Sequence, residues 1–495
     1  MARTFRLIRA GGGAARFVDG FRVSDPPVTF GDNGQSSPES CSYSVIIGNN
    51  GSGKSRLLGA IAAELVRLQR GSSGRGGRSR RIEILDYEVD GRPSGNRGLI
   101  DSLLDAQRMT DLLPQLPSRV IAVALTSVDK FPLEPSGSSD AVIERQLTAG
   151  DDDDRFYCYV GMRDRTNRAS ISALLYRALD GLHHSRGAPE TARLRQVFEF
   201  LGYAPEVYVR LNLAITPDVE AFIRGERELD EVLSTDSRLL IRLRSASKSK
   251  RYHPAWLRTA LQPFVHTIQK RAIEYRITFD GYSEPQMFEM EALRLLRRLG
   301  ALVLSSVIVR KLDGAEHDLR DASSGEISML TVFLSVAAHL RDGSLVLIDE
   351  PETSLHPEWQ SRYINLMREV FAKARGCHFV FSTHSPLIVA DMPAGASVYS
   401  MDRRAEVSSA ELLGRSPDYV MAKAFDVVEP TNLYLRDVLA EALRLVGERQ
   451  IGSAAFGEQL AELVRLSKTM DDGDQVKRIV KDLQNAQVEL ARDGN

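Results

Sequence analysis

The stretch Ser44-Val45-Ile46-Ile47-Gly48-Asn49-Asn50-Gly51-Ser52-Gly53-Lys54-Ser55 decides the fold of this 495-residue chain. Its first four residues are mostly apolar and β-branched, and the run stops at a glycine, which predicts a short buried strand. Beyond Ser55 the apolar residues follow helical spacing, namely Leu57, Leu58, Ile61, Leu65 and Leu68. The sequence therefore predicts a strand, a glycine-rich turn and a helix in direct succession.

The turn fits the pattern G-x-x-x-x-G-K-[ST] from Gly48 to Ser55. Glycines let the backbone wrap closely, so its N–H groups point at phosphate oxygens, and the helix N-terminus adds its positive dipole end. We expect Lys54 to reach the β- and γ-phosphates and Ser55 to ligate Mg²⁺. A glycine-rich turn without function is the alternative, which the flanking strand and helix disfavour. The residues predicted to bind ATP are Asn49, Asn50, Gly51, Ser52, Gly53, Lys54, Ser55 and Arg56.

A second apolar run, Leu345–Ile348, ends in the adjacent carboxylates Asp349 and Glu350. Neighbouring strand residues point to opposite faces, so packing alone does not favour two acids at the end of a buried strand. Asp349 suits Mg²⁺, and Glu350 suits polarising the attacking water as a general base. A strand end followed by a capped turn is the structural alternative.

Two shorter segments complete the set of candidate site residues. Ser323, Ser324, Gly325 and Glu326 precede a predicted helix. Ser323 and Glu326 fit a capping box, which is a structural role, but a Ser-Ser-Gly helix start also suits an anion. The strand 379–383 ends at His384. We expect this histidine to contact the γ-phosphate, although a satisfied polar residue at a strand end is the alternative.

Composition bounds the class of protein. Hydrophobic residues make up 43% of the chain and charged residues 26%, and the formal net charge is −2. This balance is typical of soluble globular proteins, and it gives no whole-chain argument for nucleic-acid binding. Neither a transmembrane run nor the apolar core of a signal peptide is found, so we expect a cytoplasmic protein without a membrane partner. The three cysteines form no C-x-x-C pair, which fits a reducing compartment.

Together these motifs resemble the ABC ATPase superfamily, firmly over residues 45–90 and 300–400 and more loosely over 1–44. The resemblance implies an α/β head, a mixed sheet with a parallel core plus N-terminal antiparallel strands. It implies ATP and Mg²⁺ as cofactors, with Gly48–Ser55 as Walker A, Leu345–Glu350 as Walker B and His384 as the switch histidine. Ser323–Glu326 would be the signature motif. In this superfamily ATP binds between two heads, so Ser323 and Gly325 would touch the γ-phosphate held by a second copy in a homodimer or a higher even oligomer.

Four segments follow from this reading of the chain. Residues 1–130 are expected to form the first part of the head, 131–300 a mainly helical insertion, and 301–415 the second part of the head. Residues 416–495 are expected to be a helical segment that docks a partner. Short strands are predicted at 82–88, 119–125 and 207–211, a hairpin around Asp313-Gly314, and helices near 170–181, 216–232, 255–271 and 288–299.

The sequence departs from the transporter pattern of the superfamily. The signature is Ala-Ser-Ser-Gly-Glu, the D-loop Thr353–His356 ends in histidine, and no glutamine follows the strand 119–125. Ser127 and Asp129 are the candidates for the metal- and water-sensing role of that glutamine. The run Asp349–Pro357 is similar to the RecF-like and OLD-like branch, which is linked to DNA repair, DNA-end processing and phage defence. Within it, the segment 129–131, the insertion and the run 416–427 look most like the standalone (PtuA-type) ATPases of Septu-type and retron-associated defence operons.

That resemblance implies a defence ATPase whose usual partner is an HNH nuclease encoded alongside, docked on residues 416–495. A RecF-like repair ATPase that loads on DNA is the alternative, and a transporter ATPase subunit is disfavoured. The acidic run Asp471–Asp474 is interpreted as an interhelix turn and not as the catalytic acids of a nuclease domain, so we expect no built-in nuclease. DNA or RNA, including retron RNA and DNA, is a possible partner of three basic clusters. These are Arg75, Arg78, Arg80 and Arg81; Arg238, Arg242, Arg244, Lys248, Lys250 and Arg251; and Arg294, Arg297 and Arg298.

Overall fold

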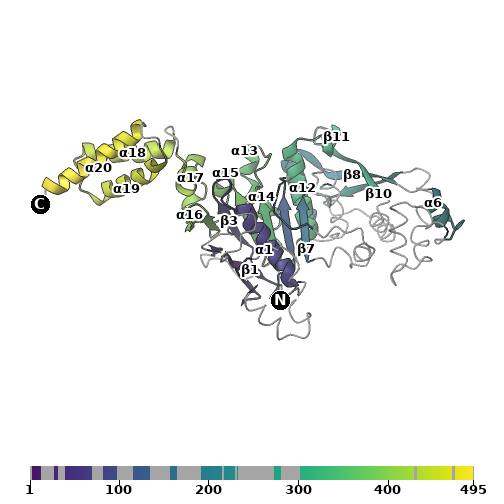
Figure 1. The fold of residues 1–495 in the computed structure, drawn as a ribbon. Coiled ribbons are helices and arrows are strands. Elements are labelled where there is room, and N and C mark those ends of the chain that lie inside the picture. The colour runs from purple at the N-terminus through teal and green to yellow at the C-terminus, as the bar shows by residue number, and fades with distance from the viewer. Residues whose placement is uncertain are drawn as a thin grey trace, which may run out of the picture.

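The computed structural model describes residues 3–12, 27–31, 40–69, 82–96, 115–126, 128–133, 156–163, 175, 191–213, 217–228, 231, 272–279, 302–428, 432–470 and 474–493. Figure 1 shows a central head, an arm rich in strands on one side and a bundle of helices with the C-terminus on the other. None of the helices in the described part of the chain is long and apolar enough to cross a membrane.

A seven-stranded sheet forms the centre of the head. Its strands are β3 (Ser42–Ile47), β6 (Val120–Ala124), β7 (Tyr157–Gly161), β12 (Leu345–Asp349), β13 (His378–Thr383), β14 (Ser397–Ser400) and β15 (Ala405–Val407). They lie in the order β15-β14-β3-β13-β12-β6-β7, and all neighbours are parallel except β15, which runs antiparallel to β14. The predicted α/β class with a parallel core is confirmed.

The strand β7 moves a predicted boundary. Tyr157–Gly161 pairs along its whole length with β6, so this part of the predicted insertion 131–300 belongs to the central sheet of the head. The central sheet therefore extends beyond the boundary predicted between residues 130 and 131. The strand is short and carries two tyrosines and a cysteine, and only its pairing with β6 in three dimensions marks it as sheet.

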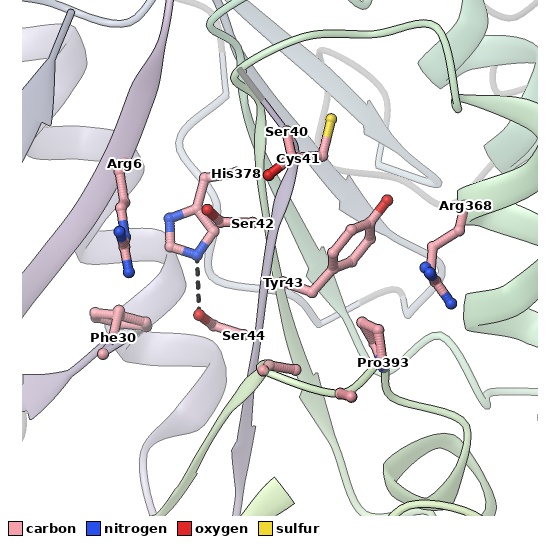
Figure 2. A pocket seen from close by; sticks show the side chains of 14 residues that line it. Arg6, Phe30, Ser40, Cys41, Ser42, Tyr43, Ser44, Arg368, His378 and Pro393 are labelled. Atoms are coloured by element: carbon pink, nitrogen blue, oxygen red, sulfur yellow. Dashed lines mark hydrogen bonds between the residues drawn. The ribbon is translucent and has the colours of Figure 1, made fainter. Parts of the chain in front are cut away.

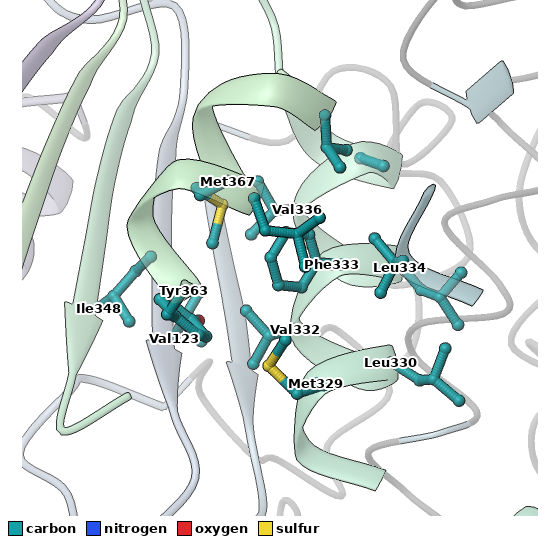
Figure 3. Close-up of a cluster of buried hydrophobic side chains, with 14 of the residues drawn as sticks. Val123, Met329, Leu330, Val332, Phe333, Leu334, Val336, Ile348, Tyr363 and Met367 are labelled. Carbon is teal, nitrogen blue, oxygen red and sulfur yellow. The ribbon is translucent and has the colours of Figure 1, made fainter. Parts of the chain in front are cut away.

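Helices cover both faces of this sheet. The helix α1 (Lys54–Gln69) packs on one face, where its leucines meet strand residues such as Ile46 and Val380. The helices α12 (Ser324–His339) and α14 (Tyr363–Val370) pack on the other, where Phe333 and Met367 lie with Val123 and Ile348 (Figure 3). Alternate residues of each strand enter opposite cores, which is why the strands are continuously apolar in sequence.

A second, antiparallel sheet packs on the α1 side. It has the order β2-β1-β4-β5 and consists of β1 (Phe5–Gly11), β2 (Val28–Thr29), β4 (Ile84–Val89) and β5 (Arg92–Gly95). Phe5, Leu7, Leu85 and Tyr87 from this sheet join the core that α1 builds. The predicted N-terminal antiparallel strands are thus present, and they form a sheet of their own.

The arm is an antiparallel sheet of order β11-β10-β8-β9. Its strands are β8 (Tyr203–Leu213), β9 (Ala272–Thr278), β10 (Leu302–Lys311) and β11 (Glu316–Asp318), with the short helices α5 (Arg195–Phe200) and α6 (Pro217–Arg224) beside them. The predicted hairpin at Asp313-Gly314 joins β10 to β11. The insertion thus contributes two long strands in addition to helices. The helices predicted at 255–271 and 288–299, and nearly all of 170–181, lie outside the described residues.

The C-terminal segment is helical, as predicted. Beyond the short α15 (Pro386–Ala390) and α16 (Ser409–Leu412) come α17 (Pro417–Ala424), α18 (Leu433–Gly447), α19 (Ala454–Leu466) and α20 (Gln475–Asp493). Asn432 and Ser453 cap the N-termini of α18 and α19. A separate core that includes Leu435, Phe456 and Leu463 holds these helices together. The bundle therefore has the internal packing of a small domain of its own.

Candidate nucleotide-binding site

The candidate residues meet at one edge of the central sheet. Since β3, β13 and β12 are parallel neighbours, their carboxyl ends lie side by side. The glycine-rich loop 48–53 follows β3, His384 follows β13, and Asp349 with Glu350 ends β12. The carboxyl edge of a parallel sheet is where ligands of α/β proteins bind.

The loop has the backbone conformation that its glycines predict. Gly48, Gly51 and Gly53 have φ angles of 152°, 82° and 102°, values that other residues rarely adopt. A Cβ added at Gly51 would meet no heavy atom within 4 Å, so this position faces open space. At Gly48 the Cβ would lie 2.9 Å from the Ser52 hydroxyl oxygen. The loop thus needs glycine at Gly51 for its backbone conformation, and at Gly48 for both conformation and close packing.

Lys54 begins α1 and lies inside the loop with only 4% of its surface exposed. Its Nζ donates hydrogen bonds to the carbonyl oxygens of Gly48 and Asn49, at 2.8 and 3.2 Å, and lies 2.7 Å from Nε2 of His384. Burial lowers the pKa of Lys54, while the carboxylates of Glu350 and Asp349 oppose that shift. The ammonium is therefore placed where phosphate oxygens would supply the negative charge that stabilises it.

Asp349 and Ser55 form an oxygen pair suited to magnesium. Asp349 is 2% exposed and accepts hydrogen bonds from the hydroxyls of Ser382 and Ser55. Burial raises the pKa of Asp349 to about 6, and the charges of Glu350 and Asp129 add to that rise. A buried carboxylate next to a hydroxyl is a hard-oxygen donor set, and Mg²⁺ is commonly held by one or two carboxylates together with substrate phosphates. No cluster of three or more His, Cys, Asp or Glu suited to a metal occurs in the described ranges.

Glu350 and His384 lie close to the same ammonium. Glu350 has a positive φ of 49°, and its backbone N–H donates to the Ser382 carbonyl at 2.9 Å. Its Oε1 lies 3.8 Å from Nε2 of His384, and both side chains are about one-third exposed, at 31% and 29%. Burial and the Lys54 charge lower the pKa of His384. A neutral imidazole therefore accepts from Lys54, while the Glu350 carboxylate remains open to water.

The segment 323–326 forms the capping box that the sequence predicts. The Ser323 hydroxyl accepts from the backbone N–H of Glu326, and Glu326 accepts from the backbone N–H of Ser323 at 2.8 Å. The Tyr203 hydroxyl also donates to Glu326, at 2.6 Å. Although burial works against it, these bonds lower the pKa of Glu326. Ser323 and Ser324 are exposed, and no hydrogen bond in the described residues joins them to the loop 48–55.

The D-loop packs against this segment. A Cβ at Gly325 would come within 2.7 Å of the Ser354 carbonyl oxygen and 2.9 Å of the Trp359 ring, so only glycine fits there. Ser354 has a positive φ of 66°, and His356 caps the next helix, α13 (Pro357–Gln360). The D-loop, which follows the carboxylate strand, and the signature segment are thus in contact within one head.

One of the two candidates for the role of the missing glutamine, Asp129, is already engaged by other groups. Asp129 is buried in a bidentate ion pair with Arg163, accepts from Tyr159 at 2.7 Å and caps the Phe131 backbone N–H at 3.0 Å. Both of its oxygens are engaged, so it acts on the site only through its charge near Asp349. The other candidate, Ser127, lies outside the described residues, as do the three basic clusters.

The sequence did not identify three residues that shape the site. Ser382 bonds Asp349, and its place in the strand before His384 could have indicated this. Asp402, after β14, accepts from the backbone N–H of Asn49 at 2.7 Å. Arg163 pairs with Asp129 across β6 and β7. Residues so distant in the chain give no sequence signal for the last two contacts.

Comparison with solved structures gives distant likenesses. The Smc head domain of Pyrococcus furiosus bound to the C-terminal domain of ScpA is 12% identical, with 80% of this chain and 93% of that chain covered and a TM-score of 0.28. The SMC head domain of Thermotoga maritima is 12% identical, with 81% and 94% covered and a TM-score of 0.26. A nucleotide-free ATP-binding cassette from an ABC transporter is 10% identical, with 82% and 90% covered and a TM-score of 0.27.

Because these TM-scores lie below 0.5, the fold and the site rest on the chain's own strand order and loop geometry. No curated protein matches the chain. A family match is more informative, because it spans residues 44–390, well over half of the chain, from the strand before the glycine-rich loop to the helix after His384. The chain therefore belongs to the family described as AAA domain, putative AbiEii toxin, Type IV TA system, and is an ATPase of the ABC/AAA type.

Proposed function

We propose that this chain is an ATPase whose heads close in pairs on ATP and thereby control a separate nuclease in antiphage defence. The observation that carries the proposal is the convergence of Lys54, Asp349, Glu350 and His384 at one edge of the sheet. The family description, a putative toxin of a toxin–antitoxin system, is compatible with a defence role.

In this proposal each residue of the site has a separate role in ATP hydrolysis. The loop N–H groups and Lys54 hold the β- and γ-phosphates, and Ser55 with Asp349 holds Mg²⁺. When bound there, Mg²⁺ would neutralise part of the negative charge on the phosphates. Glu350, whose side chain is about one-third exposed, accepts the proton of the attacking water. His384 lies between Lys54 and Glu350, so it contacts the γ-phosphate and responds to its loss.

A second copy completes each site in this proposal. The exposed start of α12 presents Ser323 and Ser324 at the positive end of a 16-residue helix. Ser323 is held by Glu326, which Tyr203 holds in turn, so the segment is ordered before any partner arrives. A preorganised, exposed anion site that does not reach its own loop suits the γ-phosphate of another head.

A continuous set of polar contacts joins the loop to the C-terminal bundle. Asp402 accepts from the backbone of Asn49, and its neighbour Arg403 forms a bidentate pair with Asp426. Asp426 also pairs with Arg465 of α19 at 2.7 Å. These contacts support the proposal that residues 416–495 transmit the nucleotide state to a docked nuclease. In this proposal the same polar pairs switch between two discrete arrangements.

The RecF-like alternative has less support among the described residues. The arginines on the arm are largely neutralised, since Arg210 pairs with Glu274 and Arg310 pairs with Glu206 and Glu316. Such a surface offers little positive charge to a DNA backbone. DNA loading is therefore the competing outcome in the experiment that tests the defence function.

The test combines a phage challenge with co-purification. The chain is expressed with the product of the adjacent gene, either as wild type or as Glu350→Gln. We expect the two products to co-purify. We also expect the wild-type chain to protect cells from phage, and Glu350→Gln to change the level of that protection. Purified alone, the chain should leave plasmid DNA intact. Strong stimulation of ATP hydrolysis by DNA without any partner, together with no effect on phage, would instead support the repair function.

A further inference from the structure

Two cysteines face each other at the end of the sheet opposite the nucleotide site. In the parallel pair β3–β13, Ser42 is in register with His378 and Tyr43 with Phe379. Cys41 and Cys377 directly precede these pairs, and the Ser42 backbone N–H donates to the Cys377 carbonyl at 2.8 Å. Both cysteine side chains belong to the α12 face of the sheet, like the stacked rings of Tyr43 and Phe379.

This register places the Cα atoms of the two cysteines within the range that a disulfide spans. Neighbouring strands lie about 4.8 Å apart, and disulfides join residues whose Cα atoms are about 4.4–6.8 Å apart. Both cysteines are free, and each directly precedes the first residue of its strand. At present the Cys41 thiol donates to the Ala374 carbonyl at 3.3 Å and the Cys377 thiol to the Arg341 carbonyl at 3.2 Å.

The two thiols differ in access. Cys377 is fully buried, whereas Cys41 is partly exposed and lies at the rim of a cavity of about 290 Å³, drawn in Figure 2. Cys41 also lines an adjacent surface hollow together with Arg368, Lys373 and Arg375. A small oxidant can therefore reach Cys41 first, in surroundings rich in positive charge.

We propose that Cys41 and Cys377 are a redox site, at which a hydroperoxide oxidises Cys41 and Cys377 resolves it to a reversible disulfide. The Cys41 thiolate attacks the peroxide oxygen, the O–O bond breaks, and a sulfenic acid and hydroxide form. The Cys377 thiol then attacks that sulfur, the S–O bond breaks, and water leaves. Two thiols and one hydrogen peroxide thus give one disulfide and two waters, and a dithiol reductant reverses the change.

The ionisation of the pair agrees with this order of events. The contact with the Cys377 thiol is the main cause that lowers the pKa of Cys41; burial and the Asp342 carboxylate oppose this shift. The pKa of Cys377 is raised by the same contact and by burial. The exposed cysteine is thus the better nucleophile toward peroxide and the buried one the resolving thiol.

The disulfide would tie together the two strands that carry the nucleotide site at their other ends. β3 leads into the loop 48–53, and β13 leads into His384. The bond links residues far apart in sequence, so it restricts the unfolded chain strongly and should raise the unfolding midpoint. The site stands independently of the proposed function, because it needs neither ATP nor a partner.

The experiment uses the purified full-length chain treated with hydrogen peroxide and then digested without reduction. We expect a cross-linked peptide pair containing Cys41 and Cys377, a mass lower by two hydrogens, one remaining thiol and a higher unfolding midpoint. Dithiothreitol should restore all three thiols. Three thiols that survive peroxide, or a disulfide that involves Cys158, would overturn the proposal.

Matched variants locate the roles. Cys158→Ser, on β7, should oxidise like the wild type. Cys377→Ser should stop at a dimedone-reactive sulfenic acid on Cys41, and Cys41→Ser should form neither product at the wild-type rate. Equal oxidation rates in Cys41→Ser and wild type would contradict the assignment of Cys41 as the attacking thiol. The wild-type peptide map decides the proposal even where a variant folds poorly.

Discussion

Replacing Asp349 by asparagine should stabilise the nucleotide-free head while it abolishes Mg²⁺-dependent ATP binding. Asp349 is almost fully buried, and its pKa is raised from 3.8 to about 6, mainly by burial. One pKa unit corresponds to about 1.4 kcal/mol, so the ionised side chain costs the folded state about 3 kcal/mol at neutral pH. The asparagine side chain carries no charge, yet its carbonyl oxygen can still accept from Ser382 and Ser55.

The pH dependence of this gain follows from the raised pKa. Between pH 4 and pH 6 the folded head holds its proton more tightly than the unfolded chain, so stability falls as the pH rises through this window. The variant lacks this loss. Its advantage should be about 3 kcal/mol at pH 7.5 and about half of that at pH 5.

Urea unfolding with EDTA and without nucleotide, at both pH values, measures the difference, and calorimetry with MgATP measures binding. Ser382→Ala is the control, since it removes a hydrogen bond to Asp349 and leaves the carboxylate in place. It should destabilise the head. An Asp349→Asn variant that is less stable than wild type at pH 7.5, or one that still binds MgATP normally, would refute the reasoning.

Three further variants test the remaining contacts. Lys54→Ala should weaken ATP binding by about 100-fold or more in calorimetry, because it removes the ammonium that the loop carbonyls hold in place for the phosphates; unchanged affinity would contradict its role. Ser323→Arg should leave ATP binding to one head within about threefold yet stop hydrolysis, since it blocks the exposed start of α12; normal turnover would exclude a shared site. ATP should protect α19 from hydrogen exchange in the wild type. Asp426→Asn should abolish this protection, whereas Glu441→Gln, from an exposed ion pair on α18, should not; equal protection in both would exclude the Asp402–Arg465 path.

The positions of the candidate site residues at strand ends could be predicted from the sequence better than the strands β7 and β9 could. The glycine loop, the two acids and His384 each follow an apolar run, so local pattern alone places them at strand ends. Four strands that carry or flank the site were recognised for the same reason. A parallel sheet then brings these ends together without any further information.

What the sequence could not give depends on contacts between distant residues. The sequence offered Asp129 as a candidate site residue. In the structure it forms an ion pair with Arg163, which follows the unpredicted strand β7. Asp402 contacts the loop across more than 350 positions. The strand β9 carries the charged residues Glu274 and Arg276 on an exposed face, so its apolar signal is weak. Pairing with β8 in the folded chain is what makes it a strand.

The central claim is that two heads close on ATP and that Glu350 acts as the base in its hydrolysis. Glu350→Gln keeps the shape of the side chain and removes its charge, so the variant should bind MgATP and hydrolyse it at least about 100-fold more slowly. Sedimentation of this variant measures the claim most directly. With MgATP it should sediment as a dimer or a higher even oligomer, and with ADP it should return to smaller species. A Glu350→Gln chain that is saturated with ATP yet sediments as in ADP would contradict the account.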